Sequence, residues 1–197
     1  MSRAGRATRR AAYVLLAAGL LALGYTAYVL ADAKAYQATE QTRFDMLRRV
    51  AATNPGAGMA PALAEGGLVG EIEIPRIGLA AMVAQGDSTM TLRRAVGHLA
   101  DTALPGEPGN VVLAGHRDTF FWPLQRVRVG DGITLRTRSG DFEYLVESTA
   151  VVEPTAVEVL RPTGGRTLTL ITCFPFSYIG SAPHRFIVRA RETAGSR

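Results

Sequence analysis

The 197-residue sequence contains a single cysteine, Cys173, and only three histidines, His98, His116 and His184. One cysteine cannot form a disulfide within the chain, nor can it supply the paired thiolates of a structural zinc site. The histidines are far apart and belong to no HExxH motif, so their spacing indicates no metal centre. We therefore expect no metal or other cofactor. The lone thiol is left as a small buried residue, an intermolecular partner or a free nucleophile.

Charge is absent from residues 11–31, AAYVLLAAGLLALGYTAYVLA. A helix needs about 20 apolar residues to cross a bilayer, and this run is long enough. A cleavable signal peptide has a shorter apolar region of about 7–15 residues, although ADA at 31–33 resembles a cleavage site. The length of the run therefore favours an uncleaved signal anchor.

Acidic residues are absent before the apolar run, whereas Arg3, Arg6, Arg9 and Arg10 precede it. By the positive-inside rule this bias predicts a cytoplasmic N-terminus, with the rest of the chain in the periplasm or outside the cell. The same four arginines account for most of the formal net charge of +5, so the remaining chain is close to neutral. The basic pI of 9.9 is thus no indication of nucleic-acid binding. We expect the membrane as a partner, and no nucleic acid.

Glycine and proline are absent from residues 32–52, whose composition favours a juxtamembrane helix. NPGAGMAP at 54–61 breaks this pattern and is typical of a linker. The expected organisation is a cytoplasmic basic segment (1–10), a transmembrane signal anchor (11–31), a juxtamembrane helix and linker (32–65), one folded domain (66–192) and a C-terminal tail (193–197).

The folded domain has the patterns of β-strands. LVGEIEI at 68–74 alternates apolar and other residues, and GNVVLAGH at 109–116 is a short apolar run typical of a buried strand. Residues 131–154 contain two alternating segments joined by Ser-Gly-Asp, which predicts a hairpin. RTLTLITC at 166–173 and RFIVRARE at 185–192 supply two further strands. Short strands between turns, with no βαβ rhythm, predict an all-β barrel or sandwich.

Cys173 stands at the predicted end of a strand, since Pro175 follows closely. A thiol nucleophile needs a base or imidazolium near it, and positive charge where an oxyanion develops. His116 follows VVLAG at another strand end, and Arg185 comes 12 residues after Cys173 at the start of the final strand. Adjacent strands would bring Cys173 and Arg185 within reach of each other. The spacing permits this geometry without requiring it, and a lone histidine is more often structural.

At these residues the sequence resembles the sortases, the cysteine transpeptidases of bacterial cell surfaces. TLITC at 169–173 is similar to the TLxTC signature of that family. Three more segments are similar and occur in the same order: GHLADTALPGEPGNVVLAGHRDTFF at 97–121, DGITLRT at 131–137 and APHRFIVRA at 182–190. The resemblance covers about residues 66–191. It is greatest to class D, while class E and the Gram-negative class also fit.

The resemblance implies a closed eight-stranded sortase-type β-barrel with an N-terminal transmembrane helix. It also implies that Cys173 attacks the Thr-Gly bond of an LPxTG-like sorting signal and forms a thioester acyl-enzyme. His116 would transfer protons, and Arg185 would steady the substrate and the oxyanion. The implied partners are a surface protein with a C-terminal LPxTG-like signal and an amine acceptor, either a cell-wall precursor or a pilin lysine.

The segment EPTAVEVLRPTGGR at 153–166 corresponds to the connection that walls the substrate groove in sortases. Val157, Val159 and Leu160 are its candidates for receiving the Leu-Pro of a signal, although ordinary loop packing explains them equally well. Thr172 is grouped with these substrate-binding candidates and is expected to support the site from the opposite face of its strand. Some sortases bind calcium beside this loop, but here it holds only two glutamates, so we predict no metal requirement.

Other classes of protein remain open. An L,D-transpeptidase also uses an exported cysteine, but its nucleophile follows a His-Gly pair, whereas Ile171 and Thr172 precede this one. A papain-like peptidase places its cysteine at the start of a helix rather than after alternating Thr and aliphatic residues. A non-catalytic, membrane-anchored β-barrel that presents an interaction surface needs no reactive thiol at all.

Overall fold

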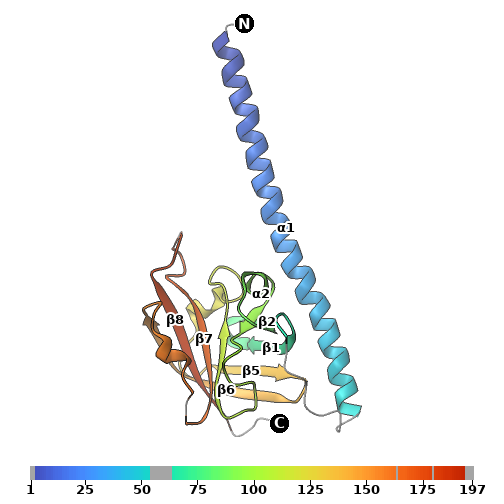
Figure 1. Ribbon diagram of the computed structural model, residues 1–197, viewed down its shortest axis with the longest axis vertical. Helices are drawn as coiled ribbons and strands as arrows, with labels where there is room; N and C mark the ends of the chain where they lie inside the picture. Colours follow the sequence, from blue (N-terminus) through green and yellow to red (C-terminus); the bar gives the residue numbers. More distant parts are fainter. Residues whose placement is uncertain (1–2, 54–63, 163, 179, 194–197) are drawn as a thin grey trace.

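The computed structural model describes residues 3–53, 64–162, 164–178 and 180–193, which form a long helix and a β-barrel (Figure 1). The N-terminal half of the helix extends well beyond the barrel, whereas its C-terminal half runs alongside it (Figure 1). The two parts therefore meet along one side of the barrel.

The helix α1 spans Arg3–Thr53 and is 51 residues long. It continues from the apolar run through the expected juxtamembrane helix, because no proline interrupts the backbone hydrogen bonds over this stretch. The separate juxtamembrane element predicted from the sequence is thus part of one helix, and the linker predicted at 54–61 lies outside the described residues. α1 is long and apolar enough to cross a membrane: its most apolar window has a mean hydropathy of 2.0, and none of that window is buried.

Eight strands close into a barrel in the order β1-β2-β3-β4-β7-β8-β6-β5, which confirms the predicted fold class. Their bounds are Leu68–Ile74 (β1), Leu79–Gln85 (β2), Val96–His98 (β3), Gly109–Ala114 (β4), Gly132–Thr137 (β5), Asp141–Val152 (β6), Arg166–Phe174 (β7) and His184–Glu192 (β8). The connections contain a short helix α2 (Thr89–Arg94) and the 3₁₀ turns η1 (Pro75–Ile77), η2 (Trp122–Arg126) and η3 (Val157–Leu160).

The pairing of the strands decides which loops meet. β5 and β6 form the predicted antiparallel hairpin, and β7 and β8 also run antiparallel. β4 and β7 are parallel neighbours, with Ala114 opposite Ile171. Because parallel strands point the same way, the chain leaving β4 emerges at the same end of the barrel as the chain leaving β7.

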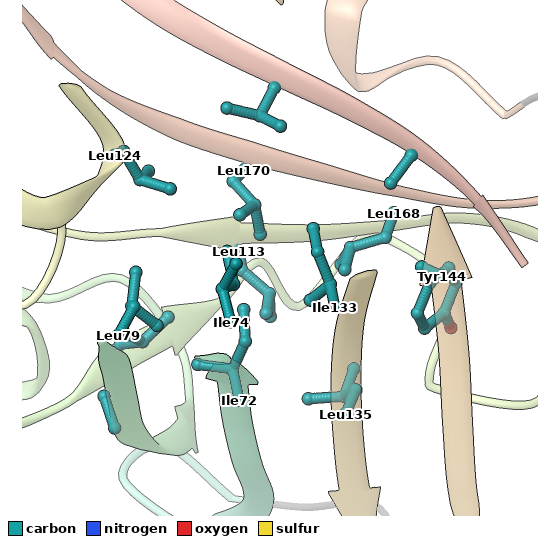
Figure 2. Packing of buried hydrophobic residues seen from close by; sticks show 14 of the residues in the cluster. Ile72, Ile74, Leu79, Leu113, Leu124, Ile133, Leu135, Tyr144, Leu168 and Leu170 are labelled. Atoms are coloured by element: carbon teal, nitrogen blue, oxygen red, sulfur yellow. The ribbon is translucent and has the colours of Figure 1, made fainter. Parts of the chain in front are cut away.

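Side chains that alternate along the strands fill the barrel. Ile72, Leu113, Leu135 and Leu170, from four different strands, are all 0% exposed and belong to one cluster (Figure 2). Burying one such side chain stabilises the fold by about 1.5–3 kcal/mol. A small barrel filled in this way has a rigid wall, so residues at the strand ends are held in fixed positions.

Hydrogen bonds attach the middle of α1 to the barrel. Asp32 accepts bonds from Nε and Nη2 of Arg94, at 2.8 and 3.1 Å, and these bonds lower the pKa of its carboxyl. The Gln37 amide donates to the main-chain carbonyl of Arg94 at 2.7 Å and accepts from the main-chain N–H of Met82 at 2.8 Å. One amide thus joins α1 to both α2 and β2.

A second set of contacts lies nearer the C-terminal end of α1. Phe44 is only 1% exposed, and the guanidinium of Arg48 lies 5.7 Å from the centre of its ring. Arg48 also pairs with Asp141, the first residue of β6, at 2.9 Å. Since Asp32 and Arg48 both bind residues of the barrel and its connections, the helix between them packs along the barrel.

Candidate active site

Cys173 and Arg185 are direct cross-strand partners near the ends of β7 and β8. Residues opposite each other on an antiparallel pair have Cβ atoms only about 4.5–5.5 Å apart. Cys173 is partly exposed, so its thiol is not the buried structural residue that a lone cysteine often is. The expectation that adjacent strands bring these two residues together is confirmed.

His116 reaches the same place from β4. The main-chain N–H of Gly115 continues the β4–β7 ladder by donating to the carbonyl of Ile171 at 3.1 Å, and His116 follows on the exposed surface. His116, Cys173 and Arg185 together line a cavity of about 340 Å³, which we call the reaction cavity. Three residues that are distant in the sequence therefore share one small space.

Thr172 holds the residue before His116 in place. Its side chain is 2% exposed, and its hydroxyl donates to the carbonyl of Gly115 at 2.7 Å. A side chain at Gly115 would meet the ring of Phe121 at 2.8 Å, so only glycine fits there without a shift. Thr172 was grouped with the substrate-binding candidates. Its side chain lies on the face opposite Cys173, as expected, and contacts the segment that leads into His116.

Arg117 fastens the loop after Cys173 to the histidine segment. Its guanidinium donates to the carbonyls of Pro175 at 3.1 Å, Tyr178 at 2.6 Å and Gly180 at 2.9 Å. It also lies 5.9 Å from the centre of the Tyr178 ring. One side chain therefore organises the β7–β8 connection, which forms part of the wall of the reaction cavity. Sequence reasoning missed this residue; its position directly after His116 was the available signal.

An apolar cavity of about 290 Å³ adjoins the reaction cavity, and Arg185 lines both. Val157, Val159 and Leu160, the predicted residues of the 153–166 loop, line this second cavity, which we call the apolar cavity. Its other walls include Ala114, Leu99, Ile171 and Ile187. Ile171 lies two residues before Cys173 and Ile187 two residues after Arg185, so strand alternation puts them on the same faces as the site residues.

The loop that walls the apolar cavity is held by its main chain. Asn110 Nδ2 donates to the carbonyl of Val159 at 3.1 Å, and Arg189 Nη2 donates to the same oxygen at 3.4 Å. The side-chain oxygen of Asn110 in turn accepts from the hydroxyl of Thr169 at 2.7 Å. Because the loop is anchored through a carbonyl, its valine and leucine side chains remain free to face the cavity.

Arg185 brings positive charge to the site. Its Nη1 donates to the main-chain carbonyls of His184 at 3.0 Å and Ala182 at 3.4 Å. Within the described part of the chain no carboxylate forms an ion pair with it. A cation with only carbonyl partners can still attract a thiolate, or the oxyanion that develops when a carbonyl is attacked.

The other two histidines occupy different surroundings. His98 is 1% exposed, with Nδ1 3.0 Å from Oε1 of Gln85 and Nε2 2.9 Å from the carbonyl of Ala103. Burial lowers its pKa, which favours the neutral ring. His184 Nδ1 lies 3.4 Å from Glu153 at the surface. Of the three histidines, His116 is the one that lines the reaction cavity.

The fold and the site together match known proteins. A family model described as the sortase domain matches residues 72–193. Sortase D of Bacillus subtilis (strain 168) is 30% identical over 196 residues, which cover 90% of this chain and 95% of that protein. The chain belongs to the sortase family, and its relatives indicate a cysteine transpeptidase.

Solved structures give the same answer. The Clostridium perfringens Sortase D5 transpeptidase is 25% identical, with a TM-score of 0.66, and the match covers 83% of this chain and 99% of that one. Sortase E from Streptomyces avermitilis is 32% identical, with a TM-score of 0.59, and the match covers 68% and 92% of the two chains. The barrel described above is thus a sortase barrel, and the resemblance noted in the sequence is confirmed.

Proposed function

We propose that the protein is a membrane-anchored sortase that cleaves an LPxTG-like sorting signal between Thr and Gly and transfers the acyl group to an amine. One observation carries this proposal: Cys173, His116 and Arg185 line one cavity, and Arg185 also lines an apolar cavity beside it. A nucleophile, a proton carrier and a cation next to an apolar recognition pocket are the groups that acyl transfer from a peptide requires.

The first half-reaction forms a thioester. The Cys173 thiolate attacks the carbonyl carbon of the Thr-Gly bond, and the electron pair of the C=O bond moves to oxygen beside the Arg185 guanidinium. When the intermediate collapses, the C–N bond breaks and protonated His116 gives its proton to the departing glycine amine. The acyl group is then bound to sulfur and His116 is neutral.

The second half-reaction reverses these roles. An acceptor amine attacks the thioester carbonyl, neutral His116 takes the proton that the amine loses, and the thiolate leaves. A thioester retains enough of the acyl group's free energy for an amine to accept it without a second energy source. The acceptor is a cell-wall precursor or a pilin lysine, and the steps use no metal or cofactor.

The apolar cavity provides the recognition. Val157, Val159 and Leu160 line it on one side and Ile171 and Ile187 on the other, which suits the Leu-Pro of a sorting signal. Since Arg185 stands at the junction of the two cavities, a peptide seated in the apolar cavity continues directly to Cys173. The residues before the scissile bond thereby select the substrate.

The proposed location follows from the anchor. The uncharged run at 11–31 spans the membrane, and the arginines before it keep the N-terminus in the cytoplasm. The barrel then lies outside the membrane, in the periplasm or on the cell surface, where a surface-protein substrate would reach it.

The proposal is tested with the purified protein, an LPxTG-like peptide and a peptide amine. We expect mass spectrometry to detect the transpeptidation product and, when the acceptor is omitted, the acyl group on Cys173. Cys173→Ala is the matched control and should give neither species. If no sorting-signal peptide acylates Cys173 of the folded protein, and the protein yields no more product than this variant, the barrel is an interaction module and not this enzyme.

A further inference from the structure

The contacts between α1 and the rest of the chain are spread along the length of the barrel, in the same order as the helix residues that make them. Asp32 binds Arg94 of α2, and Arg48 binds Asp141 at the start of β6. These two helix residues are 16 positions apart, which is about 24 Å of α-helix. The docked half of α1 therefore runs from one end of the barrel to the other.

The end near Asp32 is the end that carries the reaction cavity. β6 begins at Asp141, which forms an ion pair with Arg48, and finishes at Val152, which pairs with Arg185. A groove between α1 and the barrel is lined by Leu30 and Lys34 together with Asp118 and Phe120, which closely follow His116. In Figure 1 the β7–β8 connection accordingly points in the same direction as the N-terminal half of α1.

The apolar run of α1 ends at this same level. Residues 11–31 form about 31 Å of helix, which matches a hydrocarbon core of about 30 Å. Asp32, the first charged residue after the run, already contacts the barrel. The headgroup region adds only about 5–8 Å on each side of the core. With residues 11–31 across the bilayer, as proposed above, the barrel end that carries the reaction cavity would lie against the membrane surface and not away from it.

We propose that the mouth of the reaction cavity faces the bilayer and that a rim formed by Trp122, Phe176 and Tyr178 rests in its headgroup layer. This inference depends on the membrane anchor of the proposed function and adds the orientation of the site. The lipid surface itself is then a partner of the catalytic end. A polypeptide tethered in the same membrane can reach Cys173 along the surface.

The rim has the side chains that membrane interfaces favour. In the described barrel, Trp122 and Tyr178 are the two aromatic residues that are exposed, at 45% and 49%. Trp122 meets Phe176 edge to face, with ring centres 6.5 Å apart, and Phe176 packs on Phe186 at 5.5 Å. Trp and Tyr are enriched where an amphipathic ring sits between apolar chains and water. A supported cluster of this kind can enter the headgroup layer without rearranging the barrel.

Trp122 is the only tryptophan of the chain, so its fluorescence reports the depth of the rim directly. The full-length protein is reconstituted into phosphatidylcholine–phosphatidylglycerol vesicles, and quenching by brominated phospholipid is compared with quenching by acrylamide. Two reference proteins carry Trp122→Phe and a new tryptophan on α1. Leu21→Trp lies within the apolar run, and Met46→Trp lies on an exposed site level with the far end of the barrel.

We expect brominated lipid to quench Trp122 and Leu21→Trp several-fold more than Met46→Trp, with acrylamide giving the opposite order. If Trp122 behaves like Met46→Trp, the mouth faces away from the bilayer and the inference is wrong, although the anchor stands. If brominated lipid leaves Leu21→Trp unquenched, the anchor is absent and the orientation fails with it. Peptide transfer by the detergent-solubilised protein reports the proposed reaction separately from both outcomes.

Discussion

The reaction cavity and the apolar cavity share two strands and one side chain, yet they differ in chemistry. On β7, Cys173 lines the first and Ile171 the second; on β8, Arg185 lines both and Ile187 the second alone. Side chains two positions apart on a strand point to the same face. A shift of two residues therefore separates the proposed bond-breaking groups from the proposed recognition groups. Substitutions in the reaction cavity should lower kcat, and those in the apolar cavity should raise KM.

The largest expected effect comes from removing the nucleophile. Cys173→Ala should abolish transfer from an LPxTG-like peptide, because no other thiol exists in the chain. Binding of the same peptide, followed by fluorescence anisotropy, should keep its Kd within about threefold, since the apolar cavity is intact. Loss of binding together with transfer would show that the two cavities are not separable.

His116→Ala and Arg185→Ala come next. Each should lower kcat/KM by at least about 100-fold, as removal of a proton carrier or an oxyanion donor typically does. His184→Ala is the matched control, because its imidazole meets only the exposed Glu153, and it should change kcat/KM far less. An active His116→Ala beside an inactive but folded His184→Ala would overturn the assignment of the proton carrier.

Leu160→Asp should act on recognition alone. A carboxylate in the apolar cavity must be desolvated when substrate binds, so KM should rise about tenfold or more. Alkylation of Cys173 by iodoacetamide should keep its rate, and Leu160→Met, which preserves size and polarity, should behave almost as the unmodified protein. Equal loss of alkylation and of peptide transfer by Leu160→Asp would indicate a distorted barrel.

Thr172→Val tests the support under His116. It keeps the shape of the side chain but leaves the buried carbonyl of Gly115 without its donor, which costs about 1–3 kcal/mol. We expect a drop in kcat with little change in KM, and a melting temperature lowered by several degrees. Thr172→Ser retains the hydroxyl and should restore kcat. A changed KM with unchanged kcat would instead return Thr172 to the substrate-binding group.

The smallest effect concerns the contact between Asp32 and Arg94, which line neither cavity. The Arg94 bonds lower the pKa of Asp32, so its ionised form contributes to docking above an ordinary pKa of about 3.9, and the contribution is lost as the pH falls through the lowered value. Limited proteolysis should find the α1–barrel contact unchanged from neutral pH down to about pH 5 and looser in stronger acid. Asp32→Asn should remove this dependence while leaving peptide transfer in detergent unaltered.

Local patterns in the sequence were enough to predict most of the strands and an all-β barrel or sandwich, and the family resemblance supplied the closed eight-stranded barrel. Alternation marks β1, β5, β6, β7 and β8 because each has one face in the core. The pairing of Cys173 with Arg185 followed from the short connection between their strands. The position of His116 did not, because it depends on the parallel β4–β7 pair, whose partners are distant in sequence. There the family resemblance supplied what spacing could not.

Contacts made through the main chain escaped prediction altogether. Arg117 binds three carbonyls and Asn110 binds two more, and no residue type marks a carbonyl that will become an acceptor. The continuity of α1 was left open for a different reason. The sequence changes from apolar to charged at Asp32, so helix was predicted on both sides of this residue, but as two segments.

Because α1 is continuous, it sets the rotation of the barrel about the helix axis as well as the distance between the barrel and the apolar run. Each residue of an α-helix turns the chain by about 100°, so one residue inserted between Ala31 and Asp32 would swing the barrel about a quarter-turn around the membrane normal. Two copies that associated through their apolar runs would consequently present their catalytic ends at one set angle to each other. If α1 spans the membrane as proposed, this helix would set the orientation of the site as well as tether it to the membrane.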